Sequence, residues 1–201
     1  TLTSSNCTAP ANVSQSVTMD VYPIPTWYAD ADGDGFGNGA LASITNCVQP
    51  LGYVSNNTDC DDDNAEVFPG SVSPRIFRTK QNGNWGSILT WEAFDGCNWI
   101  TGLVPTAADG QISILHDIVI NSIANADQLV VNSGASLSVS SGTLQIEDGP
   151  GTDLLVNGTF TLSNHLLGNG SVNISSGAQF NWINGNLPVG SGSINIETGA
   201  T

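Results

Sequence analysis

The stretch Val130-Val131-Asn132-Ser133-Gly134-Ala135 is one of four versions of a short theme in the second half of the chain. An apolar residue or pair is followed by a polar turn that contains glycine. The theme returns at residues 155–159, 174–178 and 196–200, and its glycines at 134, 158, 177 and 199 lie 24, 19 and 22 residues apart. A period of about twenty residues is typical of a solenoid, in which successive turns of the chain stack on one another.

Apolar and small polar residues alternate between these turns, which indicates β-strands with one buried face. We expect a mainly β protein with a right-handed parallel β-helix over residues 111–201, because parallel crossovers are right-handed. The predicted inward residues are Leu137, Val139, Leu144, Ile146, Phe160, Leu162, Val172, Ile174, Phe180, Trp182, Ile194 and Ile196.

Two other folds share part of this pattern. A β-sandwich also has short strands with regular turns and is the main structural alternative. Leucine-rich repeats have a similar period, but their helix-forming half is absent here. The matched turn spacing favours the β-helix. The last theme stops at Thr201, where the next inward strand should start. We therefore expect the solenoid to be truncated there, as part of a larger chain, or covered by another subunit.

An acidic segment precedes the solenoid and has a different chemistry. In Asp30-Ala31-Asp32-Gly33-Asp34-Gly35, three carboxylates at every second position precede glycine. This spacing lets a turning backbone point the carboxylates at one centre, and hard oxygen ligands suit Ca²⁺. An ordinary Asp/Gly surface turn is the alternative interpretation. Residues 25–70 are therefore predicted to form a small, loop-rich calcium-binding module.

The loop is not an EF-hand, because the twelfth position from Asp30 is Leu41, where an EF-hand needs glutamate. The missing oxygen ligands must come from elsewhere, and a second acidic run follows at 59–66. Eight of the eighteen acidic residues fall between positions 30 and 66, a density that would repel itself without cations. The predicted ligands are Asp30, Asp32, Asp34, Phe36, Asp59, Asp61, Asp62, Asp63 and Glu66.

The composition excludes several partners. The net charge is −15, and the only basic residues are Arg75, Arg78 and Lys80. Such a chain lacks the basic surface that binds nucleic acid, and anionic membranes repel it. No apolar run is long enough to cross a bilayer. Residues 1–24 are rich in Ser, Thr, Asn and Pro and are predicted to be a tail or linker. Residues 71–110 carry three of the five tryptophans and are predicted to be a cap or connector.

The four cysteines are Cys7, Cys47, Cys60 and Cys97. Their wide spacing, without a Cys-x-x-Cys pair, favours an extracellular disulfide framework over a zinc site. Cys47 and Cys60 would close a short loop beside the second acidic run, which leaves Cys7 for Cys97. Cys7 could instead link to another chain. Secretion to the cell exterior or surface is the expected localisation.

Five blocks of the first half of the chain follow one another in a recognisable order: residues 27–37, Cys47, residues 50–54, residues 59–62 and Pro69-Gly70. Together they resemble the metal-binding repeat of MopE-type bacterial surface proteins. The resemblance implies divalent-metal binding in a secreted protein, with Asp-rich parts akin to thrombospondin-type calcium repeats. The copper associated with MopE involves histidine. Residues 25–70 contain no histidine, so copper is not expected.

The remainder resembles β-helical modules of large secreted surface proteins from Bacteroidota-type bacteria. The matching blocks are residues 83–85, 90–92, 104–109 and 151–159. This resemblance implies display on the outer surface and no defined reaction.

The predicted solenoid offers few candidate catalytic residues. Residues 111–201 contain no Lys or Arg, which β-helical lyases often use as the base. Glu147, Asp148 and Asp153 are the only local carboxylate group, and their Gly/Pro-rich setting indicates a turn. The tryptophans at 85, 91, 99 and 182 could stack on sugars, but core or cap positions are the simpler interpretation.

We therefore expect a non-enzymatic calcium-binding module of a large secreted surface protein, acting as an adhesive or structural scaffold. Its partners would be surface polysaccharide or neighbouring protein subunits. The alternatives are a polysaccharide-active β-helix enzyme, a lyase or hydrolase, and a subunit of an extracellular filament assembled through solenoid ends.

Overall fold

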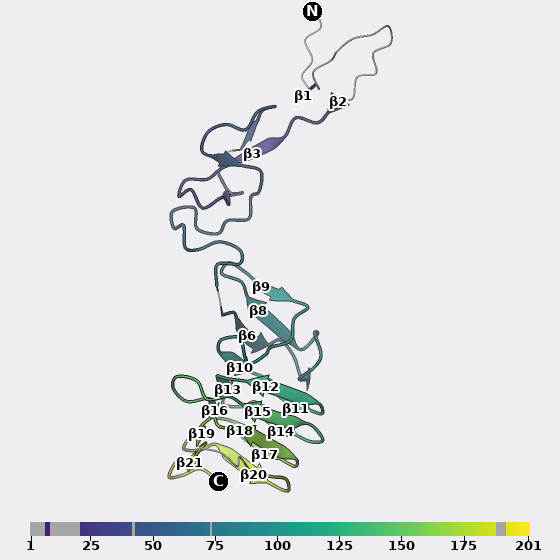
Figure 1. The fold of residues 1–201 in the computed structure, drawn as a ribbon, viewed down its shortest axis with the longest axis vertical. Coiled ribbons are helices and arrows are strands. Elements are labelled where there is room, and N and C mark those ends of the chain that lie inside the picture. Colours follow the sequence, from purple (N-terminus) through teal and green to yellow (C-terminus); the bar gives the residue numbers. More distant parts are fainter. Residues whose placement is uncertain (1–6, 9–20, 42, 73, 188–191) are drawn as a thin grey trace, which may run out of the picture. The chain divides into compact units, whose positions relative to one another are not determined.

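The computed structural model describes residues 7–8, 21–41, 43–72, 74–187 and 192–201 (Figure 1). The chain divides into two compact units, Thr1–Ser71 and Val72–Thr201. Most of the tail predicted at residues 1–24 lies outside the described residues. In the part of the chain that the structure describes, no helix is long and apolar enough to cross a membrane.

The first unit contains short antiparallel strands and long connections. One antiparallel pair joins β1 and β2, and a three-stranded sheet has β3 in the centre. The strands of this unit are β1 (Cys7–Thr8), β2 (Val21–Tyr22), β3 (Thr26–Ala29), β4 (Ile44–Thr45) and β5 (Tyr53–Val54).

The second unit contains three sheets whose strands recur in order along the chain (Figure 1). The eight-stranded sheet consists of β21 (Ile194–Ile196), β19 (Val172–Ile174), β16 (Leu154–Val156), β13 (Leu129–Val131), β10 (Ile112–Ile114), β6 (Ile76–Thr79), β8 (Trp91–Phe94) and β9 (Trp99–Thr101). The five-stranded sheet consists of β20 (Gln179–Trp182), β17 (Thr159–Leu162), β14 (Ser136–Val139), β11 (Asp117–Ile120) and β7 (Gly83–Asn84). The three-stranded sheet consists of β12 (Ile123–Ala126), β15 (Thr143–Ile146) and β18 (His165–Gly168).

These sheets form a right-handed parallel β-helix of about four turns, which confirms the predicted fold class. Parallel pairing already starts at β6 and β7, upstream of residue 111, and β8 and β9 extend the largest sheet with antiparallel pairs. Residues 72–110 thus belong to the same unit as the solenoid.

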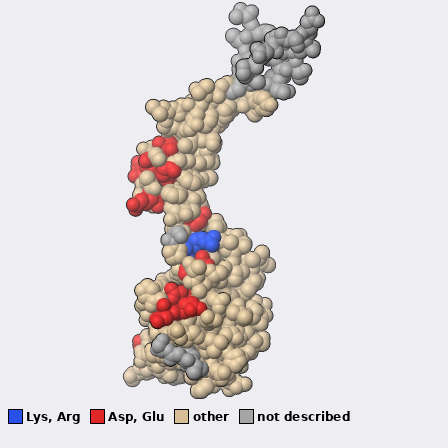
Figure 2. All heavy atoms as spheres, in the orientation of Figure 1, with Lys and Arg blue, Asp and Glu red and all other residues tan. Residues whose placement is uncertain are grey.

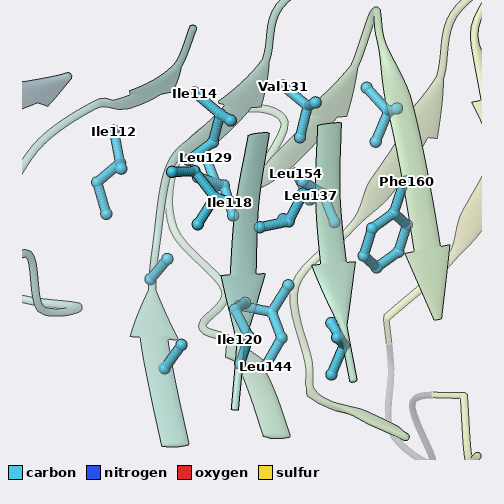
Figure 3. Close-up of a cluster of buried hydrophobic side chains, with 14 of the residues drawn as sticks. Ile112, Ile114, Ile118, Ile120, Leu129, Val131, Leu137, Leu144, Leu154 and Phe160 are labelled. Atoms are coloured by element: carbon cyan, nitrogen blue, oxygen red, sulfur yellow. The ribbon is translucent and has the colours of Figure 1, made fainter. Parts of the chain in front are cut away.

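The core consists of inward-facing residues that stand in register with one another on successive turns of the β-helix. Ile118, Leu137 and Phe160 are paired across β11, β14 and β17, and all three are fully buried (Figure 3). The residues between them on each strand face outward and are partly exposed, as period-two alternation requires. Burying such ladders in three sheets gives the solenoid one continuous apolar core, which stabilises the stack of turns.

The glycines of the repeated theme are required for two different reasons. Gly134, Gly177 and Gly199 have positive φ values of 83°, 82° and 96°, a backbone conformation that other residues rarely adopt. Gly158 has no positive φ, but a Cβ there would lie 2.3 Å from the carbonyl oxygens of Ala135 and Asn132. At this position the turn below approaches too closely for any side chain.

The two ends of the core differ. At the β6–β8 end, Trp85 and Trp91 are buried and pack edge-to-face, with ring centroids 4.9 Å apart, and the Trp91 indole N–H donates to the Trp85 carbonyl. At the other end, Trp182 and Ile196 are in register with buried Leu162 and Ile174, yet each is 57% exposed. Their predicted burial is therefore wrong, because no further turn covers them among the described residues.

Candidate metal centre

Backbone N–H groups of the acidic loop in the first unit fix the carboxylates of that same loop. Gly33, Asp34 and Phe36 donate backbone N–H bonds to Oδ1 of Asp30, Asp32 and Asp34, at 2.9, 3.2 and 2.8 Å respectively. Each of these bonds occupies one oxygen of a carboxylate. Gly33 and Gly35 have φ values of 82° and 94°, which allow the backbone to bend at each glycine. The spacing of the three aspartates therefore produces a row of fixed carboxylates.

The second acidic run folds against this loop. Asp62 Oδ1 accepts a 3.0 Å bond from the Ala31 N–H, and Asp59 Oδ1 accepts one of 3.0 Å from Asp61. The Asp59 N–H in turn donates to the Gly37 carbonyl at 3.0 Å. Asp59 and Asp62 are only 7% and 5% exposed. Residues about thirty positions apart thus bring carboxylates to one place.

Two groups of carboxylates result. Asp30, Asp32 and Asp62 each have an oxygen within 4.8 Å of the other two, and so do Asp32, Asp34 and Asp59. Asp32 belongs to both groups. Since every donor is a hard oxygen, the arrangement suits a hard divalent cation better than a soft metal.

Four oxygens in these groups have no hydrogen-bond partner although they are buried. They are the Oδ2 atoms of Asp32, Asp34, Asp59 and Asp62. A buried oxygen without a partner costs free energy, more so when it carries charge. In each of these side chains Oδ1 accepts a backbone N–H, and the second oxygen remains for a ligand.

The electrostatics of the acidic loop also favour a bound cation. Burial raises the pKa of Asp34, and the nearby charges of Asp32, Asp59 and Asp30 raise it further, whereas the N–H of Phe36 lowers it. Burial and these like charges therefore disfavour the charged form of the Asp34 carboxyl. A divalent cation would remove this repulsion.

The remaining predicted ligands are placed differently. Asp61, Asp63 and Glu66 are exposed and belong to neither group. Phe36 stacks on Phe68, with ring centroids 5.0 Å apart, and closes the loop through its N–H bond to Asp34.

Sequence reasoning missed Asn56, whose side chain joins the two segments. Its Nδ2 donates to the Gly35 carbonyl at 2.9 Å, and its Oδ1 accepts from the Gly37 N–H at 3.2 Å. Asn56 thereby satisfies both polar groups of the bend that follows the aspartates. Nothing in its sequence setting distinguishes it from other loop asparagines.

The predicted disulfide pairing is wrong. Cys47 and Cys60 are not bonded to each other, so the predicted pair Cys47–Cys60 does not form. Cys47 is disulfide-bonded, and the side chain of Cys7 lies outside the described residues. The error has a local cause. Asp59 and Asp62 face inward, which leaves Cys60 exposed on the other side of the segment. Short separation along the chain does not by itself supply the geometry of a disulfide.

The carboxylates considered for catalysis lie in a turn of the solenoid. Asp153 is buried and accepts hydrogen bonds from the N–H of Gly149 and from the N–H and hydroxyl of Ser171. Its contacts connect two neighbouring turns of chain. His116 shares a 2.9 Å hydrogen bond with Thr79. These side chains therefore have structural contacts in the fold.

No family model matches the chain, and no match to a curated protein or to a solved structure was found. The resemblances of residues 27–70 and 83–159 to known modules stay predictions.

Proposed function

We propose that the chain is a non-enzymatic, calcium-stabilised part of an extracellular surface protein, in which the β-helix serves as a rigid scaffold. The observation that carries this proposal is the set of four buried carboxylate oxygens without a partner, gathered in two groups that share Asp32. Calcium supplies the partner that each of these oxygens lacks.

The packing of the first unit supports a need for bound ions. Among its described residues, Asp59 and Asp62 are the only buried side chains, and every buried apolar residue of the described chain lies between Phe77 and Ala178. A unit of this size whose described part buries no apolar side chain is commonly stabilised by metal ions or disulfides. Calcium binding would therefore contribute directly to folding of this unit.

The geometry favours two ions. Calcium binds oxygens at about 2.3–2.6 Å, so two ligands of one ion lie within roughly 5 Å of each other. Each group of three carboxylates satisfies this limit. The five aspartates carry five negative charges, and a single divalent ion would leave most of that charge uncompensated. Asp32 would bridge the two ions.

Calcium titration of the whole chain, followed by melting with and without a chelator, tests the proposal. At a hundredfold excess over its Kd, calcium contributes about 2.7 kcal/mol, which raises the melting temperature of so small a unit by roughly 10 °C or more. Asp32→Asn should abolish this rise. Asp63→Asn is the matched control, because Asp63 is exposed and outside both groups, and it should leave the rise unchanged.

A third variant, Asp34→Asn, distinguishes the two proposed ion positions. Isothermal titration should give two calcium ions for the parent chain and one for Asp34→Asn, which removes a ligand from one group only. Equal melting temperatures with and without chelator, together with no measurable calcium binding, would contradict the proposal.

A further inference from the structure

A groove of about 250 Å³ lies in the second unit, on the outer face of the largest sheet. Its floor includes Arg78 of β6 and Ser113 of β10, which are direct neighbours in register. Both alternate with buried residues and so point away from the core. Trp99 of β9 forms one wall, and the guanidinium carbon of Arg78 lies 3.8 Å from its ring centre.

The lining combines apolar surface with polar groups that retain bonding capacity. Ile76 and Leu115 expose apolar side chains in the groove. Gln111 donates to the Ser113 hydroxyl at 3.3 Å, which leaves its own side-chain oxygen and the Ser113 O–H for a ligand. Among the described residues, Arg78 uses only Nε, in its contact with Glu92, so both terminal nitrogens face no protein acceptor.

This combination selects the class of ligand. A sugar ring has apolar C–H faces and hydroxyls around its edge, which match the exposed aliphatic side chains of Ile76 and Leu115 beside N–H and O–H groups. An added peptide strand is disfavoured, because β6 and β10 are each paired on both sides and offer no open edge.

The charge of the protein indicates which kind of saccharide the groove would bind. The net charge of −15 repels polyanions, and Glu92 already neutralises much of the charge of Arg78. On the face drawn in Figure 2, the visible Lys and Arg atoms form one small group amid uncharged and acidic surface. We propose that this groove binds a neutral oligosaccharide, with one sugar ring on the apolar walls and its hydroxyls bonded by Arg78, Gln111 and Ser113.

Titration calorimetry and saturation-transfer NMR of the whole chain test this proposal. The probes are neutral oligosaccharides (glucose-, xylose-, mannose- and N-acetylglucosamine-based) and oligogalacturonate as the acidic counterpart. We expect saturable binding of at least one neutral probe, with a Kd of about 1 mM or below, and weaker binding of the acidic probe.

The variants Leu115→Ala and Gln111→Ala should each weaken binding about three- to tenfold, since each removes one contact from an exposed side chain. Ile123→Ala is the matched control: Ile123 is an exposed apolar residue of β12, outside the groove, and its truncation should leave the affinity unchanged. The proposal is overturned if no neutral probe binds saturably, if the acidic probe binds better, or if the groove variants bind as tightly as the control.

Discussion

Asp127 and Glu197 lie on the same solenoid, yet their surroundings shift their pKa values in opposite directions. The pKa of Asp127 is raised by burial first and then by the charges of Asp153, Glu147 and Asp148. One of its oxygens is buried without a partner, and a Cβ on Gly149 would lie 2.2 Å from that oxygen. The pKa of Glu197 is lowered by hydrogen bonds from the Asn173 side chain and the Ser176 N–H.

Asp127→Asn should stabilise the solenoid at neutral pH. Because the folded-state pKa is raised, the unfolded chain releases this proton first, so stability falls as pH rises from the ordinary value of 3.8 through the raised pKa. An asparagine side chain does not ionise, so the variant does not lose stability as pH rises. We expect a melting temperature roughly 1–2 °C above the parent at pH 7, a gain that disappears as pH falls below the ordinary value.

Glu197→Gln provides the comparison of opposite sign. The stability given by a lowered carboxyl pKa is present above the ordinary value of 4.5 and is lost as pH falls through the lowered pKa. This variant should therefore be less stable than the parent at pH 7 and equal to it in acid. Parallel pH–melting curves for Asp127→Asn and the parent would contradict the role assigned to Asp127.

Individual site residues were predictable to different degrees. The spacing of Asp30, Asp32 and Asp34 predicts their common direction, because it follows from local backbone geometry. Which members of the second run face inward depends on how that segment docks on the loop. Asp59 and Asp62 are buried whereas Asp61 is exposed, and no pattern of residues within the run predicts this difference in burial.

At the scale of elements, the turns of the solenoid depend on close approach between successive coils. Gly158→Ala should lower the free energy of unfolding by about 2–4 kcal/mol, because its Cβ would overlap two carbonyl oxygens of the preceding turn. Urea unfolding monitored by circular dichroism measures the change.

Gly86→Ala is the control for this substitution. Gly86 is exposed, has no positive φ, and would place its Cβ 3.6 Å from the nearest atom, the Ser122 hydroxyl oxygen. Its stability should stay within about 0.5 kcal/mol of the parent. Equal effects at positions 86 and 158 would show that the close approach at Gly158 does not limit stability.

The elements of the solenoid were largely predictable, and those of its first turn were not. Alternation such as Leu137-Ser138-Val139 repeats at matched spacing, so inward positions follow from sequence. The antiparallel pairs of β6, β8 and β9 have no repeat to reveal them, and the tryptophans there indicate burial without a partner strand. Disulfide pairing likewise depends on distances that sequence separation does not supply.

At the scale of the whole molecule, the two units are stabilised in different ways. The solenoid buries stacked apolar ladders, whereas the described part of the first unit buries carboxylates and no apolar side chain. Figure 2 shows acidic atoms gathered in the first unit and again on the solenoid. Among the described residues, groups of three carboxylates with buried, unpartnered oxygens occur in the first unit alone. Calcium should therefore stabilise that unit and leave the stability of the solenoid unchanged.

Stacking also predicts a gradient of local stability along the solenoid. β16 is paired on both sides, by β13 and β19, whereas β21 is paired by β19 alone among the described strands. Terminal turns of a solenoid open more easily than central ones because they have one neighbour. Hydrogen exchange followed by mass spectrometry should show amides of Ile194–Ile196 exchanging at least about tenfold faster than those of Leu154–Val156.

The same experiment at two protein concentrations separates an open end from a covered one. Trp182 and Ile196 expose apolar surface at positions that are core positions one turn earlier, so a second copy stacked there would bury them and pair the edge of β21. Slower exchange in β21 at high concentration, with unchanged exchange in β16, would show such association and support assembly through solenoid ends. Exchange in β21 as slow as in β16 at every concentration would contradict the gradient, because a strand with one neighbour would then be as stable as a strand with two.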